Sequence, residues 1–124
     1  MKLNPDCIRD LLLAVEEYTD KETYLDYPSK EADQYLSEYP SNEVRYHIEQ
    51  CYLAGLILEV DEDLSGNCSV SYLTPNGHEF VANIRTDKHW NKTKEIAKEI
   101  GSSSLSTLIQ VAAQVISNLI TNYR

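Results

Sequence analysis

The fold is decided by residues 44–60, whose sequence is VRYHIEQCYLAGLILEV. In its first half, apolar residues recur three to four positions apart, which is the spacing of one side of a helix. Gly55 then supplies the left-handed residue with which helices commonly end. The residues after Gly55 are leucines and β-branched residues, which favour a strand. The stretch predicts a helix, capped by Ser41 or Asn42, that turns at Gly55 into a strand.

Upstream of this stretch, the sequence predicts a helix, a short strand and a second short helix. The first helix covers residues 5–18, because Asn4 can cap it and Pro5 suits its first position. Residues 23–27 alternate as a short strand does, and residues 29–39 are compatible with a helix.

Downstream, the pattern predicts the rest of a hairpin and three more helices. Residues 61–67 form a polar turn, and residues 69–73 alternate like a strand that pairs with the one before the turn. Thr74 precedes a proline and caps the next helix. Two further helices are expected at 88–100 and 103–123.

This order of elements is typical of a winged helix-turn-helix. We therefore expect an α+β, mostly helical fold with a two- or three-stranded wing sheet and a C-terminal helical extension for oligomerisation. The expected winged-helix domain is 1–87 and the extension is 88–124. Residues 46–57 resemble the end of the recognition helix of winged-helix repressors, and residues 72–80 resemble the exit from their second wing strand.

The whole chain also resembles a family of small bacterial, phage and prophage proteins known as domain of unknown function 2513. The resemblance lies in Met1–Asp6 with Arg9–Leu13, Tyr46–Ile48 with Ala54–Ile57, Leu73–Phe80, and Lys94–Ala97 with Gly101–Ser102. It implies a cytosolic protein often encoded on mobile elements. It brings no catalytic residues and no ligand.

Charge is unevenly distributed along the 124 residues, which carry 20 acidic and 11 basic side chains and a net charge of -9. Residues 1–80 hold 17 acids and 5 bases, whereas residues 81–124 hold 3 acids and 6 bases. The acidic part includes the helix and wing that a winged helix would place on DNA, so polyanions should be repelled there.

The acidic part is also rich in tyrosine, which favours a protein partner over DNA. We expect a homo-oligomeric protein that acts by protein–protein contact. Its partner could be a host protein that binds nucleic acid. The tyrosines predicted to bind the partner are Tyr24, Tyr27, Tyr35 and Tyr39. The alternative is that these tyrosines only pack the helices.

A DNA-binding transcriptional regulator is the alternative function. It would use residues of the recognition helix and of the basic stretch near Trp90: Arg45, Tyr46, His47, Gln50, Arg85, Lys88 and Lys92. The basic stretch can equally be a solvated helix face with Trp90 packed inside.

The last predicted helix has no charged residue between Ser102 and Tyr123. Its apolar seam is wider than one small domain needs, so we expect it to form an oligomer, most simply a dimer. The predicted oligomerisation residues are Leu105, Leu108, Ile109, Ala112, Val115, Ile116 and Leu119. A polar side of Ser, Thr, Asn and Gln argues against a membrane-spanning helix.

No catalytic, cofactor or metal site is expected. The sequence has no nucleophile elbow, phosphate-binding loop or metalloprotease motif. His47 and Cys51 are four residues apart on a helix, but two ligands do not make a structural zinc site. The three cysteines have no paired spacing, which argues against a disulfide framework. The N-terminus is polar and shows no secretory signal, so we expect a cytoplasmic protein.

Overall fold

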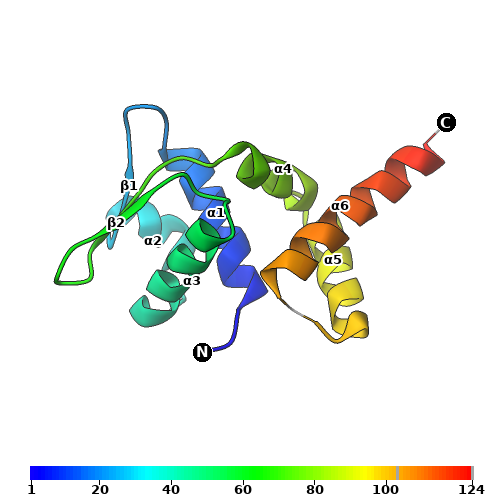
Figure 1. The fold of residues 1–124 in the computed structure, drawn as a ribbon, viewed down its shortest axis with the longest axis horizontal. Helices are drawn as coiled ribbons and strands as arrows, with labels where there is room; N and C mark the ends of the chain where they lie inside the picture. Colours follow the sequence, from blue (N-terminus) through cyan, green and yellow to red (C-terminus); the bar gives the residue numbers. More distant parts are fainter. Residues whose placement is uncertain (103, 124) are drawn as a thin grey trace. The chain divides into compact units, whose positions relative to one another are not determined.

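The computed structural model describes residues 1–102 and 104–123. Over these residues the fold is α+β, with six helices and one three-stranded antiparallel sheet (Figure 1). The chain divides into two compact units, which we call unit 1 (Met1–His78) and unit 2 (Glu79–Arg124). This division lies upstream of the expected domain boundary at 87/88, which stays a prediction.

The first helix of unit 1 begins where the sequence predicts. α1 (Pro5–Tyr18) is capped by Asn4, whose side-chain oxygen accepts hydrogen bonds from the N–H groups of Asp6 at 3.1 Å and Cys7 at 3.4 Å. Its buried side includes Ile8, Leu11, Leu12 and Val15, and α1 packs against both of the next two helices.

Those two helices begin in different ways. α2 (Lys30–Leu36) is capped by Ser29, whose hydroxyl accepts from the N–H of Ala32 at 3.0 Å. α3 (Ser41–Leu53) follows Pro40 and has no side-chain cap, so the expected cap by Ser41 or Asn42 is wrong. The proline fixes the chain direction at this point, and Ser41 is already the first helical residue.

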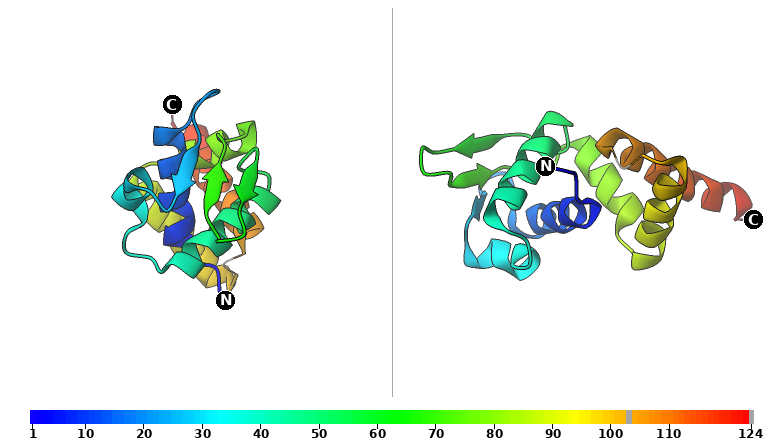
Figure 2. Two further views of the ribbon diagram at one scale, coloured as in Figure 1. Left: turned by 90° about the vertical axis from the view of Figure 1, so that its left-hand side faces the viewer. Right: turned by 90° about the horizontal axis from the view of Figure 1, so that it is seen from below.

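The sheet has the order β1-β3-β2, with β1 (Leu25–Tyr27), β2 (Val60–Glu62) and β3 (Cys68–Val70). A separate bridge between Ile57 and Leu73 continues the hairpin towards α3. Within unit 1 the β2–β3 hairpin extends away from the helices (Figures 1 and 2). The arrangement is compatible with a winged helix-turn-helix whose wing sheet has three strands.

The start of α4 (Pro75–Ile84) is fixed to the chain just after α3. The hydroxyl of Thr74 accepts from the N–H of Gly77 at 3.1 Å, and the N–H of Thr74 donates to the Leu56 carbonyl at 3.1 Å. Gly77 lies so close to this carbonyl that a Cβ there would overlap it. The sequence Leu-Thr-Pro-Asn-Gly therefore serves packing.

Unit 2 is built on two long helices. α5 (Asp87–Ile100) is capped by Thr86 and ends at Gly101, which has a left-handed φ of 82°. α6 (Leu105–Asn122) is capped by Ser104 and packs along α5. Within residues 1–102 and 104–123, no helix is long and apolar enough to cross a membrane.

Candidate functional site

A winged helix would offer α3 and the hairpin to a partner, so we examined their exposed side chains. We define the α3–hairpin face as the exposed or half-exposed residues Tyr46, Glu49, Tyr52, Leu53, Asp61, Glu62 and Leu64. α3 contacts β2, which brings the two parts of the face together. Residues 41–69 hold six acidic side chains and only one arginine or lysine. This face is therefore acidic and partly apolar.

Arg45 is that single cation, and its side chain lies against the hairpin turn. Its Nε donates to the Ser41 carbonyl at 3.4 Å, and a side chain at Gly66 would collide with its guanidinium. The same turn carries Asp63. The positive charge of α3 is thus held beside acidic residues of its own chain.

The tip of the hairpin is ordered by Asp63. Its carboxylate accepts hydrogen bonds from the N–H of Asn67 at 3.0 Å, from the Asn67 side-chain amide at 3.0 Å and from the N–H of Ser65 at 2.8 Å. These bonds, those of Asn67 first, lower the pKa of Asp63. The turn holds a fixed negative charge next to the exposed Leu64.

An acidic hollow on the outer side of the sheet shares Asp61 and Glu62 with the α3–hairpin face. Asp26, Ser69 and Asp61 stand side by side on the three strands, and the Ser69 hydroxyl donates to Asp26 Oδ1 at 2.7 Å. These residues and Glu62 line a hollow of about 520 Å³. A carboxylate-lined hollow of this kind suits a cationic side chain.

His47 is buried, which contradicts its predicted place on a DNA-reading surface. Its Nε2 accepts from the N–H of Asn4 at 2.8 Å, and its Nδ1 lies 2.7 Å from the Glu43 carbonyl oxygen, to which it donates in the matching tautomer. The Asn4 side-chain amide also donates to Glu43 Oε1 at 3.0 Å. His47 was predicted to read DNA as a residue of the recognition helix, but it lies on the buried side of α3. Tyr46 and Gln50 are half-exposed.

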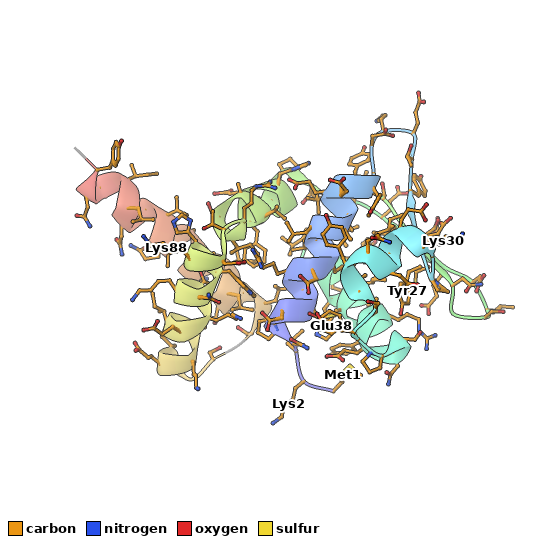
Figure 3. The ribbon with its side chains drawn as sticks, turned by 180° about the vertical axis from the view of Figure 1, so that it is seen from behind. Met1, Lys2, Tyr27, Lys30, Glu38 and Lys88 are labelled. Atoms are coloured by element: carbon orange, nitrogen blue, oxygen red, sulfur yellow. The ribbon has the colours of Figure 1, made fainter. Side chains whose placement is uncertain are left out.

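The four tyrosines predicted to bind a partner are in different environments. Tyr24 is exposed, whereas Tyr27 is buried where β1 leads into α2 (Figure 3). Tyr35 and Tyr39 are both half-buried. The Tyr39 hydroxyl donates a hydrogen bond to Asp10 Oδ2 at 2.6 Å. Tyr27 and Tyr39 therefore pack the unit, which is the alternative the sequence left open for them.

The basic stretch of unit 2 runs from just before α5 along the helix, with Lys88 in its first turn (Figure 3). The exposed basic residues in and just before this helix are Arg85, Lys88, Lys92 and Lys98. Lys92 lies 4.0 Å from Glu95, and Lys94 lies over the buried Trp90 at 5.4 Å from the ring centroid. Part of the positive charge is thus already paired or packed.

The predicted oligomerisation seam of α6 is largely used inside one chain. Leu105, Leu108, Ala112 and Val115 are buried, so the expectation that they face a second copy is corrected. The same spacing that fits a coiled coil also fits packing on α5. The other predicted residues remain accessible, with Ile109 and Ile116 half-exposed and Leu119 exposed.

The three cysteines are buried. No group of three or more His, Cys, Asp or Glu residues there is placed to hold a metal ion. Burial raises the pKa of Cys7 to about 12, helped by the Glu43 carboxylate, and burial also raises the pKa of Cys51 and Cys68. A buried thiol with a raised pKa is a poor nucleophile.

The chain is similar to one protein family and to a protein of Haemophilus influenzae. A family described as "Hypothetical protein (DUF2513)" has a model that matches residues 2–104. The chain belongs to this family. The chain is also 32% identical over 123 residues to an "Uncharacterized protein" of Haemophilus influenzae, covering 97% of this chain and 99% of that protein. No solved structure matches the chain. The family match ends just before α6 begins.

Sequence reasoning missed the exposed apolar residues of the α3–hairpin face. Tyr52, Leu53 and Leu64 are all exposed, yet none was a predicted partner residue. Leu53 and Leu64 could have been found, because Leu53 is five residues beyond the buried Ile48 and off its helical side, and Leu64 interrupts an acidic turn. Tyr52 directly follows the buried Cys51 in α3, but its own side chain is exposed.

Proposed function

We propose that this chain acts through protein–protein contact, with the α3–hairpin face as the binding surface. The observation that carries the proposal is the chemistry of this face. A winged helix that binds DNA needs arginines and lysines here for the phosphates. This face has carboxylates and apolar side chains, and Arg45 lies beneath the hairpin turn.

The partner that fits this face is the basic surface of another protein, such as one that binds nucleic acid. Glu49, Asp61 and Glu62 supply the complementary charge, and the hollow on the outer side of the sheet can take a lysine or arginine side chain. Tyr52 and Leu53 supply the apolar contact that usually provides most of the binding energy. The proposal involves no enzymatic step and no cofactor.

Binding of two labelled probes at low ionic strength tests this proposal. One probe is a short random-sequence DNA duplex, and the other is an arginine- and lysine-rich peptide. Fluorescence anisotropy should show micromolar peptide binding that weakens with salt, and no saturable duplex binding below about 100 µM.

The variant Tyr52→Ser should weaken peptide binding about tenfold, because it removes a central aromatic contact. Tyr123→Ser is the matched control, since Tyr123 is an exposed tyrosine of unit 2, outside the face. Equal affinities for the two variants would contradict the assignment of the face, and failure of the wild type to bind the peptide would contradict the basic partner.

DNA binding remains the alternative function, and the exposed lysines of α5 are the observation that favours it. Micromolar duplex binding that falls steeply with salt would establish this alternative instead. In that case Lys88→Ala and Lys92→Ala should each remove one phosphate contact. The slope of log K against the logarithm of the salt concentration should then decrease by about one for each variant. Cytoplasmic location and a phage or prophage origin, which the family resemblance implies, accompany either function as proposals.

A further inference from the structure

α6 carries a second apolar seam that packing on α5 does not bury. Ile109, Ala113, Ile116 and Ile120 follow one another at spacings of four, three and four residues, and Tyr123, the residue that caps the end of α6, comes three residues later. Such spacing keeps side chains on one side of a helix and is the repeat of helix pairs that interdigitate. We call these five residues the outer seam.

The outer seam is accessible and becomes more so towards the C-terminus. Ile109 and Ile116 are half-exposed, whereas Ile120 is 69% exposed and Tyr123 is 89% exposed. Leu119 beside it is 45% exposed, and Leu119, Ile120 and Tyr123 line a shallow hollow of about 290 Å³. Figure 1 and the right-hand view of Figure 2 show the last turns of α6 extending beyond α5. Isolated exposed apolar residues are ordinary, but five in a heptad-like row are not.

Charge decides which occupant suits this seam. The chain has a net charge of -9, so two copies repel one another over most of their surface. Residues 102–123 contain no charged side chain, so here two copies can approach without that repulsion. A charged partner would gain nothing from a neutral surface, and helices that lie on anionic lipid carry lysine or arginine on their polar side.

We propose that the outer seam of α6 pairs with the outer seam of a second copy to form a homodimer. This proposal does not depend on the proposed function, because it concerns unit 2 and not the α3–hairpin face. Ala113 lies at the small position of the row, where two helices can approach closely. Because few side chains per copy take part, the dimer is a weak one with micromolar dissociation.

Sedimentation equilibrium of the full chain over a range of concentrations tests the proposal. The wild-type mass should rise from 14.2 kDa towards twice that value. Ile120→Lys places a charge in the middle of the exposed part of the seam and should weaken dimerisation at least tenfold. Because Ile120 is exposed, this variant keeps the core, and far-UV circular dichroism confirms that it is folded.

The matched control is Asn118→Lys, which adds the same charge to the opposite side of the same helix. It should dimerise like the wild type. Three results would overturn the proposal: a wild type that stays monomeric up to about 1 mM, equal behaviour of the two lysine variants, or a monomer that binds phosphatidylcholine vesicles through Ile120 instead of its own copy.

Discussion

A single buried histidine shows how a residue can suggest one role in the sequence and have another in the fold. His47 accepts from the N–H of Asn4 and lies within hydrogen-bonding distance of the Glu43 carbonyl oxygen, so both ring nitrogens have partners. It ties the N-terminal segment to α3. Val44, Ile48 and Cys51 have the spacing of one helical side and are buried, and His47 is buried with them although its place in the candidate recognition helix suggested contact with DNA. A polar ring can be buried when both nitrogens find partners.

Tyr39 allows a test of buried polar contacts at the level of one hydrogen bond. Burial raises the pKa of Asp10, and the bond from the Tyr39 hydroxyl opposes that rise. When the pKa of a carboxyl is higher in the folded than in the unfolded chain, ionisation of that carboxyl destabilises the fold. The destabilisation grows as the pH rises from the unfolded pKa to the folded pKa. Tyr39→Phe removes the opposing bond, so the pKa of Asp10 should rise further.

We expect Tyr39→Phe to lower the free energy of unfolding by about 1–2 kcal/mol at pH 7. The loss should be smaller near pH 3, where Asp10 is protonated in both states. Urea denaturation at the two pH values measures this difference. Tyr35→Phe is the control, because the half-buried Tyr35 ring keeps its edge-on contact with Tyr18 at 6.1 Å. A pH-independent loss for Tyr39→Phe would contradict the role of Asp10.

At the scale of elements, Gly55 and Gly77 are expected to be needed for different physical reasons. Gly77, at the start of α4, lies against the Leu56 carbonyl, so Gly77→Ala forces backbone to move. Gly55 has a φ of 77° but open space around it, so Gly55→Ala meets only backbone strain. We expect losses of about 2–3 kcal/mol for Gly77→Ala and about 1 kcal/mol for Gly55→Ala.

Thermal or urea unfolding of the two variants measures these losses. The reverse order would contradict the close approach of α4 to Leu56. Val81→Ala, in the same helix, gives the size of an ordinary core loss for comparison, because Val81 is fully buried.

The existence and order of the elements could be predicted from the sequence, but their exposed sides could be predicted only in part. Caps at Asn4 and Thr74 and the left-handed stop at Gly101 mark element ends by local chemistry. The sequence predicts a strand directly after Gly55, but β2 begins at Val60, because pairing with Val70 decides where a strand lies. The two seams of α6 have the same spacing, and only the position of α5 determines which one is buried.

For the whole molecule, charge separates the two units. Unit 1 has 16 acidic and 5 basic side chains, whereas unit 2 has 4 acidic and 6 basic ones. Like charges within unit 1 repel, and salt screens them. Raising NaCl from about 0.01 M to about 0.15 M shortens the screening length from about 30 Å to about 8 Å.

We therefore expect this change in salt to stabilise the chain by about 1 kcal/mol, or about 4–8 °C in Tm for a unit of this size. Differential scanning calorimetry measures the shift. The double variant Asp61→Asn and Glu62→Gln removes two exposed charges from β2 and should reduce the gain. If salt stabilised this variant as much as the wild type, the charges of β2 would not contribute to the repulsion. A loss of stability with salt in the wild type would contradict charge repulsion within unit 1.

The location of the single tryptophan gives each unit its own optical signal. Trp90 is buried in α5 of unit 2, and eight of the nine tyrosines belong to unit 1. Tyrosine does not absorb at the red edge of the indole band, so fluorescence excited there comes from Trp90 and reports on unit 2. The near-ultraviolet circular dichroism of tyrosine reports mainly on unit 1. Two coincident unfolding curves would mean that the chain unfolds as one cooperative body, and two separate curves would mean that it unfolds as two.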